Sequence, residues 1–191
     1  MIPIPQMLMI GSTGRNTGKT LFAMEAVRRL KEQYPVIALK VTSLDKHGGE
    51  CHKGDLGCGA CSSLQGDYEI VEELDSGTAK DTSQLLKSGA ARVYWLKSLR
   101  SHLSSGIKEF LTLIPPNALV ICESNSLRKA VKPGAFVILH NRENAAIKPT
   151  AKAVWDLADR VIDKDMRSHA GEVLDSFAIE DKNGVLSIRL R

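Results

Sequence analysis

The sequence has few aromatic residues and no long apolar run. Only 5% of its 191 residues are Phe, Trp or Tyr, and 26 Lys and Arg residues are interspersed with 22 Asp and Glu residues. Surfaces that bind nucleic acid usually combine clustered basic residues with aromatic side chains, so we expect no nucleic acid partner. No run approaches the ~20 apolar residues that span a bilayer, so we expect no membrane partner.

The first nine residues lack the features of a secretory signal. Met1–Met9 has neither a charged start nor a long apolar stretch. We therefore expect a cytoplasmic protein, in which the four cysteines are thiols or metal ligands rather than disulfides. The length and the apolar content of 43% fit a single α/β domain over residues 1–191.

Apolar runs alternate with amphipathic segments along most of the chain. The expected strands are Met7–Ile10, Val36–Thr42, Tyr68–Leu74, Arg92–Leu96, Ala118–Cys122, Ala135–Leu139 and Arg160–Ile162. The expected helices are Gly18–Gln33, Thr78–Ser88, Leu99–Ile114 and Thr150–Leu157. This alternation favours a doubly wound, mostly parallel sheet, which binds ligands at the carboxyl ends of its strands.

Two segments depart from this alternation. Residues 43–66 have no hydrophobic period and are rich in Gly, Cys, His and charged residues, so we expect a functional or disordered loop there. Near the end of the chain, apolar and polar residues alternate on both sides of Asn183-Gly184, which is a strong hairpin signal. We expect residues 172–191 to form a β-hairpin that extends the edge of the sheet.

The segment Ile10–Thr20 has the sequence expected of a phosphate-binding loop (P-loop). It follows an apolar run, opens an amphipathic helix and ends in Gly-Lys-Thr, so its backbone N–H groups and the helix N-terminus would hold a polyphosphate. Lys19 would reach the β- and γ-phosphates, and the Thr20 hydroxyl would bind Mg²⁺. The residues predicted to bind a nucleoside triphosphate are Gly14, Arg15, Asn16, Thr17, Gly18, Lys19, Thr20 and Leu21.

The loop departs from the usual pattern at its first glycine, which is replaced by Thr13. Gly11 and Gly14 flank that position, and either one would supply the positive φ of the turn that leaves the strand. The alternative interpretation is a Gly-rich turn between a strand and a helix, with a solvated lysine.

A P-loop enzyme also needs an acidic residue at the end of a nearby buried strand, where it orders Mg²⁺ or its water. Glu123 directly follows the apolar strand Ala118–Cys122. We therefore predict a Mg²⁺ site formed by Thr20 and Glu123, with Lys19 and Glu123 as catalytic residues. The alternative for Glu123 is an acid that only stabilises a helix N-terminus.

Smaller polar groups provide further candidates for the site. Asp45 and Asp81 are other acidic residues that follow or precede expected elements. Lys80 and Asp81 lie where a loop meets a helix, so they would face the substrate pocket or cap the helix. Asn141 would hydrogen-bond a purine edge or belong to an ordinary loop, and the guanine-reading pattern Asn-Lys-x-Asp is not matched.

The loop over residues 43–66 carries a cluster of residues of the types that bind metals. These are Cys51, Cys58, Cys61, His47 and His52. The two residues between Cys58 and Cys61 let both thiolates bind one ion, and Cys51 with a histidine would complete a tetrahedral set. Zn²⁺, an iron–sulfur cluster, a redox dithiol and free thiols all remain open. Cys122 lies in an apolar strand, so we expect a small core residue there.

Taken together, these segments resemble the molybdopterin-guanine dinucleotide biosynthesis protein B (MobB) family. The resemblance runs from about Leu8 to Asp163 and includes the P-loop, the strand with Lys40, Gly77-Thr-Ala-Lys-Asp-Thr82, Ser88-Gly-Ala90 and Glu123. It implies a P-loop protein that binds GTP, hydrolyses it weakly and is usually a homodimer. It also implies a partner enzyme, which attaches a nucleotide to the molybdenum cofactor.

The chain departs from that family at three points. Cysteines dominate the loop where the family has histidines, and Glu123-Ser124 stands where Glu-Gly is usual. Thr13 in place of glycine is similar to the P-loop of dethiobiotin synthetase and its cobyrinate-synthase relatives, which use ATP. A member of the family with cysteines in the loop would serve a different metal cofactor.

The sequence therefore supports three hypotheses. The first is a Mg²⁺-dependent protein that binds a nucleoside triphosphate, GTP rather than ATP, hydrolyses it slowly and assists the biosynthesis or insertion of molybdenum or another metal cofactor. The second is an ATP-dependent ligase or kinase of the dethiobiotin-synthetase type, which acts on a small molecule. The third is a metal-binding module that no longer uses nucleotide.

Overall fold

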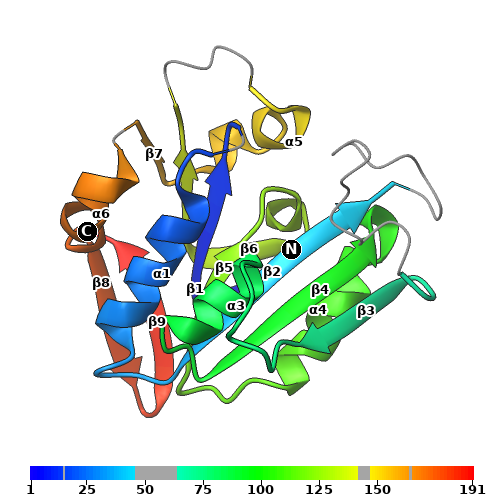
Figure 1. The fold of residues 1–191 in the computed structure, drawn as a ribbon, viewed down its shortest axis with the longest axis horizontal. Coiled ribbons are helices and arrows are strands. Elements are labelled where there is room, and N and C mark those ends of the chain that lie inside the picture. The colour runs from blue at the N-terminus through cyan, green and yellow to red at the C-terminus, as the bar shows by residue number, and fades with distance from the viewer. Residues whose placement is uncertain (15, 46–63, 142–146, 164) are drawn as a thin grey trace.

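A computed structural model describes residues 1–14, 16–45, 64–141, 147–163 and 165–191 of the protein (Figure 1). The strands are β1 (Ile2–Ser12), β2 (Val36–Leu44), β3 (Tyr68–Glu72), β4 (Arg92–Leu99), β5 (Leu119–Glu123), β6 (Val131–Leu139), β7 (Arg160–Ile162), β8 (Phe177–Lys182) and β9 (Val185–Leu190). The α-helices are α1 (Lys19–Leu30), α3 (Asp81–Lys87), α4 (Leu103–Thr112), α5 (Pro149–Lys152) and α6 (Met166–Leu174). Short 3₁₀ turns are η1 (Arg100–His102), η2 (Ser126–Lys129) and η3 (Trp155–Leu157).

The central sheet has seven strands in the order β3-β4-β2-β5-β1-β6-β7. Its neighbouring strands are parallel except for the pair β3–β4. The carboxyl ends of β1, β2, β5 and β6 therefore meet at one edge of the sheet. This arrangement confirms the α/β class and the mostly parallel sheet expected from the sequence.

Helices cover both faces of this sheet, and each face has its own hydrophobic cluster. Helices α1 and α3 lie in front of the sheet in Figure 1 and α4 lies behind it. The front cluster includes Phe22 of α1, Leu85 of α3 and Val173 of α6. The rear cluster includes Phe110 of α4, whose ring packs edge-to-face on Tyr94 at 5.7 Å between centroids. Strands buried on both faces explain the nearly continuous apolar runs in the sequence.

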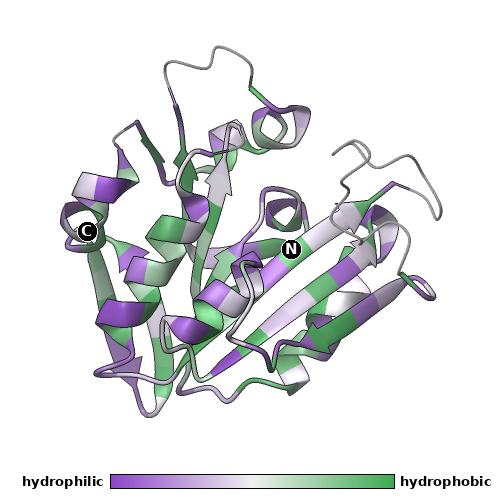
Figure 2. Cartoon of the chain, in the orientation of Figure 1, coloured by the Kyte–Doolittle hydropathy of each residue, from purple (hydrophilic) through white to green (hydrophobic). Residues whose placement is uncertain are grey.

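Helix α1 connects β1 to β2 and shows why its segment folds as it does. It mixes apolar and polar residues (Figure 2), and its buried residues are Phe22, Ala23, Ala26 and Val27, which share one face of the helix. It begins at Lys19 and ends at Leu30, slightly inside the range expected from the sequence. Its packing fixes the helix N-terminus beside the carboxyl ends of β1 and β5.

The expected C-terminal hairpin forms, but the prediction that it extends the edge of the sheet is wrong. Strands β8 and β9 pair only with each other among the described residues, and they join at Asn183-Gly184, where both residues have positive φ. Phe177 and Ile188 belong to the front cluster. A Cβ on Gly134 would lie 2.0 Å from the carbonyl oxygen of Pro5 and 2.2 Å from that of Ile188. The hairpin therefore lies across a face of the sheet at β1 and β6.

Other elements differ from the sequence expectations in their extent. Helix α6 was not expected, and residues 172–174, assigned to the hairpin, are its last residues. The Asp165 side chain caps this helix by accepting a hydrogen bond from the Arg167 amide at 3.0 Å. The helix expected over residues 150–157 is the short α5 followed by η3, and the helix expected over 99–114 starts as η1. Strand β1 is longer than expected and has an irregularity between Ile4 and Leu8.

Cys122 is fully buried in β5, in agreement with its expected role as a small core residue. Burial raises the pKa of its thiol well above the usual range. Across the described ranges, none of the helices is both long enough and apolar enough to cross a membrane.

Candidate functional site

The chain makes a tight turn between β1 and α1 at the carboxyl edge of the sheet. Asn16 and Gly18 have positive φ values of 55° and 82° in this turn. Gly11, one of the two glycines expected to supply the positive φ of this turn, does not have a positive φ. A Cβ on Gly18 would also lie 2.9 Å from the Cβ of Met166, so this position favours glycine for two reasons.

Helix α1 starts from this turn with its N-terminus open to a ligand. Gly18 is its N-cap residue and makes no side-chain capping hydrogen bond, and the first turn contains no acidic residue. The first N–H groups of a helix have no acceptor within the helix, and they carry a partial positive charge. Such a terminus can bind an anion directly.

The Lys19 ammonium lies over the turn, held by the end of β1. Its Nζ donates a hydrogen bond to Ser12 Oγ at 2.8 Å. Ser12 Oγ in turn donates to the Gly14 carbonyl oxygen at 3.0 Å. Ser12 is completely buried, so this chain of contacts holds the positive charge next to the helix N-terminus.

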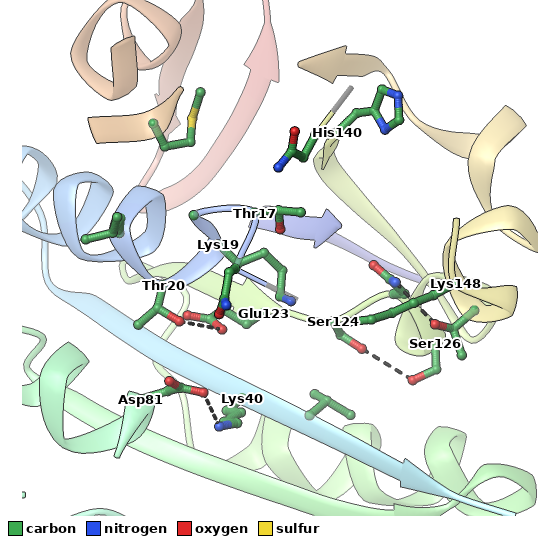
Figure 3. A pocket seen from close by; sticks show the side chains of 18 of the residues that line it. Thr17, Lys19, Thr20, Lys40, Asp81, Glu123, Ser124, Ser126, His140 and Lys148 are labelled. Atoms are coloured by element: carbon green, nitrogen blue, oxygen red, sulfur yellow. Dashed lines mark hydrogen bonds and ion pairs between the residues drawn. The ribbon is translucent and has the colours of Figure 1, made fainter. Parts of the chain in front are cut away.

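Glu123 ends β5 and points toward the first turn of α1 (Figure 3). Thr20 Oγ1 donates to its Oε2 at 3.4 Å, whereas its Oε1 is buried and has no hydrogen-bond partner within the described part of the chain. The residue is only 5% exposed, and this burial raises the pKa of its carboxyl group. The positive charges of Lys19 and Lys40 act in the opposite direction. The result is a buried carboxylate with one oxygen available for a cation.

A second charged pair lies beside Glu123. Lys40 occupies the position of β2 that is in register with Glu123, and its Nζ contacts Asp81 Oδ2 at 2.5 Å (Figure 3). Asp81 is the first residue of α3 and faces the cavity, as one of its two interpretations predicted. Lys80 is exposed and does not line the cavity. Asp45 pairs with Arg100 at 2.8 Å and is not among the described residues that line the cavity.

These groups line an open cavity of about 1370 Å³. Hydroxyl groups form one wall, at the ends of β2 and β5, where Ser43 Oγ donates to Ser126 Oγ at 2.8 Å. Polar residues that follow β6 and β7 also line the cavity. These are His140, Asn141, Lys148, Asp163, Asp165 and Arg167. The turn before α1 therefore shares the cavity with polar residues from the ends of several strands.

The structure brings together most of the residues predicted for nucleotide and Mg²⁺ binding. Those that line the cavity are Asn16, Thr17, Gly18, Lys19, Thr20, Leu21 and Glu123. Gly14 is buried and is not among the residues that line the cavity. Arg15 and the predicted metal ligands Cys51, Cys58, Cys61, His47 and His52 lie outside the described residues. Among the residues that are described, no group of three or more His, Cys, Asp and Glu side chains could hold a metal ion.

Sequence reasoning did not single out Ser12, Asn125, His140 or Lys148 for this site. Each of them lies at or soon after the carboxyl end of a strand, or at the start of the next helix. Because the carboxyl ends of parallel strands share an edge, polar residues at those positions are a signal that could have identified them. Sequence analysis named Lys40 only as part of the family resemblance. Its position next to Glu123 depends on the pairing of β2 with β5, which the sequence does not reveal.

Comparison of the protein with family models, with curated proteins and with solved structures gives no match. The resemblance to the MobB family therefore stays a prediction. What the site does has to be inferred from the groups that surround the cavity.

Proposed function

We propose that the protein binds a Mg²⁺–nucleoside triphosphate in this cavity and hydrolyses it slowly. The observation that carries the proposal is the position of Glu123. Its buried carboxylate faces Lys19 and Thr20 in the first turn of α1, and one of its oxygens has no partner in the described structure. A cation and a polyphosphate supply the charges that this arrangement is missing.

The phosphate chain would bind at the turn that precedes α1. The positive φ values of Asn16 and Gly18 shape this turn, and the uncapped start of α1 offers N–H groups to phosphate oxygens. Lys19 would exchange its hydrogen bond with Ser12 Oγ for one with a β- or γ-phosphate oxygen. No side-chain carboxylate lies in the first turn of α1 to repel the phosphates.

The residues present fit Mg²⁺. Mg²⁺ prefers oxygen ligands and is usually held by one or two carboxylates together with substrate phosphates. Glu123 and Thr20 provide a carboxylate and a hydroxyl whose oxygens are 3.4 Å apart, and Glu123 Oε1 lacks any other described partner. An ionised carboxylate is costly to bury without compensation, so a bound cation would relieve that cost. When bound, Mg²⁺ would neutralise charge on the phosphates.

The chain's own residues favour slow hydrolysis over fast turnover. Glu123 is the carboxylate nearest to Thr20, and we assign it to Mg²⁺. Asp81 is paired with Lys40 at 2.5 Å. Neither of these two carboxylates is then free to accept a proton from an attacking water, so their contribution to hydrolysis is positioning and electrostatic stabilisation.

The resemblance to the MobB family supports a more specific role. On that basis we propose GTP as the nucleotide, a homodimer as the working form, and assistance to a partner enzyme in the biosynthesis or insertion of a molybdenum or other metal cofactor. His140, Asn141 and Asp163 line the wall beyond the turn and offer polar atoms to a base or ribose. These groups are compatible with either purine.

One observation favours a second function, that of an ATP-dependent ligase or kinase that acts on a small molecule. The cavity continues past the turn to Lys40, Thr42, Ser43 and Ser126, a wall of hydroxyl groups and one ammonium. Such a wall would suit a small acid or alcohol. Fast ATP turnover that starts only when a small acid is added, without a preference for GTP, would select this function.

Titration calorimetry with Mg²⁺ and either GTP or ATP tests the proposal. The wild type should bind one nucleotide per chain, and Lys19→Ala should abolish binding while circular dichroism shows an unchanged fold. Lys108→Ala, which removes an exposed lysine of α4 outside the cavity, is the matched control and should bind like the wild type. Equal binding by Lys19→Ala and the wild type would contradict the proposal.

A further inference from the structure

The side chain of Asn125 is joined to the end of β1 by two hydrogen bonds. Its Oδ1 accepts from the Ser12 amide at 2.8 Å, and its Nδ2 donates to the Ser12 carbonyl oxygen at 2.9 Å. Asn125 is the residue before η2, but its side chain does not cap that turn. The side chain thus pairs with Ser12 as a neighbouring strand would, at the point where β5 has already ended.

The backbone of β1 is shaped to admit this side chain. A Cβ on Gly11 would lie 2.6 Å from Asn125 Oδ1 and 3.0 Å from the ring of Phe136. Real Cβ atoms do not approach other atoms so closely, so glycine is required at this position for the amide to reach Ser12. Gly11 therefore allows a close side-chain contact, whereas the sequence indicated only that Gly11 or Gly14 would supply a positive φ.

Thr13, which stands where the usual P-loop pattern has glycine, is held by other backbone contacts. Thr13 is only 1% exposed, its amide donates to the Leu139 carbonyl oxygen at 3.0 Å, and its carbonyl oxygen accepts from the Lys148 amide at 2.9 Å. The chain leaving β1 is thus held from both sides, by Asn125 next to β5 and by the end of β6. Fixed neighbours, rather than a flexible glycine, determine its path.

We infer that Asn125 is the positioning residue of the phosphate-binding turn. By fixing both backbone groups of Ser12 it places Ser12 Oγ, which holds Lys19 Nζ at 2.8 Å. This inference rests on the proposed function, because its consequence is correct placement of Lys19 for the β- and γ-phosphates. Since Asn125 follows Glu123 by two residues, one short segment places both the Mg²⁺ carboxylate and the turn.

The test compares nucleotide affinities of Asn125→Ala with those of the wild type, by calorimetry in the presence of Mg²⁺. Asn125→Ala should weaken binding of the triphosphate by on the order of tenfold, because two backbone contacts are lost. Binding of the corresponding monophosphate, which does not reach Lys19, should change much less. Asn117→Ala, at the opposite edge of the sheet and exposed, is the matched control and should behave like the wild type.

Gly11→Ala provides a second route to the same change, because its Cβ would displace Asn125 Oδ1. Gly11→Ala should weaken triphosphate binding as Asn125→Ala does. The variant that carries both substitutions should bind the triphosphate no more weakly than either single variant, because both substitutions act on one contact. This pair keeps the test decisive if one variant folds poorly.

Three results would overturn the inference: Asn125→Ala binding like Asn117→Ala, an equal loss for triphosphate and monophosphate, or additive effects of the two substitutions. If Lys19→Ala abolishes binding while Asn125→Ala does not affect it, the inference fails and the proposed function stands. If the wild type binds no triphosphate, both fail.

Discussion

Replacing Glu123 by Gln should make the ligand-free protein more stable and should weaken the effect of Mg²⁺ on nucleotide binding. The substitution keeps the size of the side chain and an acceptor for the Thr20 hydroxyl, which now contacts Oε2 at 3.4 Å. It removes a buried charge whose other oxygen has no partner in the described structure. The gain in stability and the weaker effect of Mg²⁺ both follow from losing the charge of the Glu123 carboxylate.

The size of each effect follows from the burial of this carboxylate. An ionised carboxylate without full compensation costs more to bury than a neutral amide, but the Gln amide would itself stay without a partner, so Glu123→Gln should raise the free energy of unfolding by only about 1 kcal/mol. For a domain of this size, 1 kcal/mol raises Tm by about 2–4 °C. Loss even of a group that only orients a metal ligand costs about 10–100-fold in metal affinity, so the Mg²⁺-dependent part of nucleotide affinity should fall at least about tenfold.

The stability difference should also depend on pH. Burial raises the pKa of Glu123 in the folded protein above its usual value of 4.5. Glu123 therefore destabilises the folded protein least below pH 4.5, where its carboxyl group is protonated in both states. The free energy of unfolding falls as the pH rises through the raised pKa of the folded protein. Glutamine does not titrate, so the advantage of Glu123→Gln over the wild type should grow across that window.

Thermal unfolding at several pH values and calorimetric titration with and without Mg²⁺ measure these effects. Glu32→Gln, which changes an exposed carboxylate near the end of α1, is the matched control and should alter neither quantity. A ligand-free Glu123→Gln variant that is less stable than the wild type at neutral pH would refute the reasoning about burial. Retention of the full Mg²⁺ effect would refute the assignment of Glu123 to the metal.

Two further predictions concern packing. Gly134→Ala should destabilise the protein by about 3 kcal/mol in denaturant unfolding, because its Cβ would collide with two backbone oxygens of β1 and β9; Gly171→Ala in α6, where the nearest atom is 3.6 Å away, should instead stabilise it by about 0.5–1 kcal/mol. Equal effects of the two would show that the hairpin does not pack on the sheet as described. Cys122 should resist thiol reagents in the native protein, as measured by mass spectrometry of its peptide, because it is buried and burial raises its pKa. Its labelling at the rate of an exposed thiol would place β5 at the surface.

The features that sequence could predict are those encoded locally. The apolar run before Glu123 and the Gly-Lys-Thr sequence before α1 each identify the end of an element, and the geometry of a parallel sheet then brings such ends together. The contact between Thr20 and Glu123 follows from this reasoning, although their separation is 103 residues. The class of the fold could be predicted for the same reason.

The features that sequence could not predict depend on which distant segments meet. Asn125 contacts Ser12 across 113 residues, and nothing in the local pattern around either residue indicates that pairing. The alternation in residues 177–190 shows which side chains are buried, but not whether a sheet edge or a sheet face buries them. Helix α6 was missed because its buried residues, Met166, Ala170 and Val173, form a short and weakly apolar stripe.

Hydrogen exchange of the backbone amides tests the central claim most directly. The claim is that the turn before α1 and the first turn of that helix hold the phosphates through main-chain N–H groups. Addition of Mg²⁺ and a nucleoside triphosphate should slow exchange at Gly18, Lys19, Thr20 and Leu21, and should leave the amides of the β8–β9 hairpin unchanged. Saturating nucleotide that leaves these four amides at their ligand-free rates would contradict the claim.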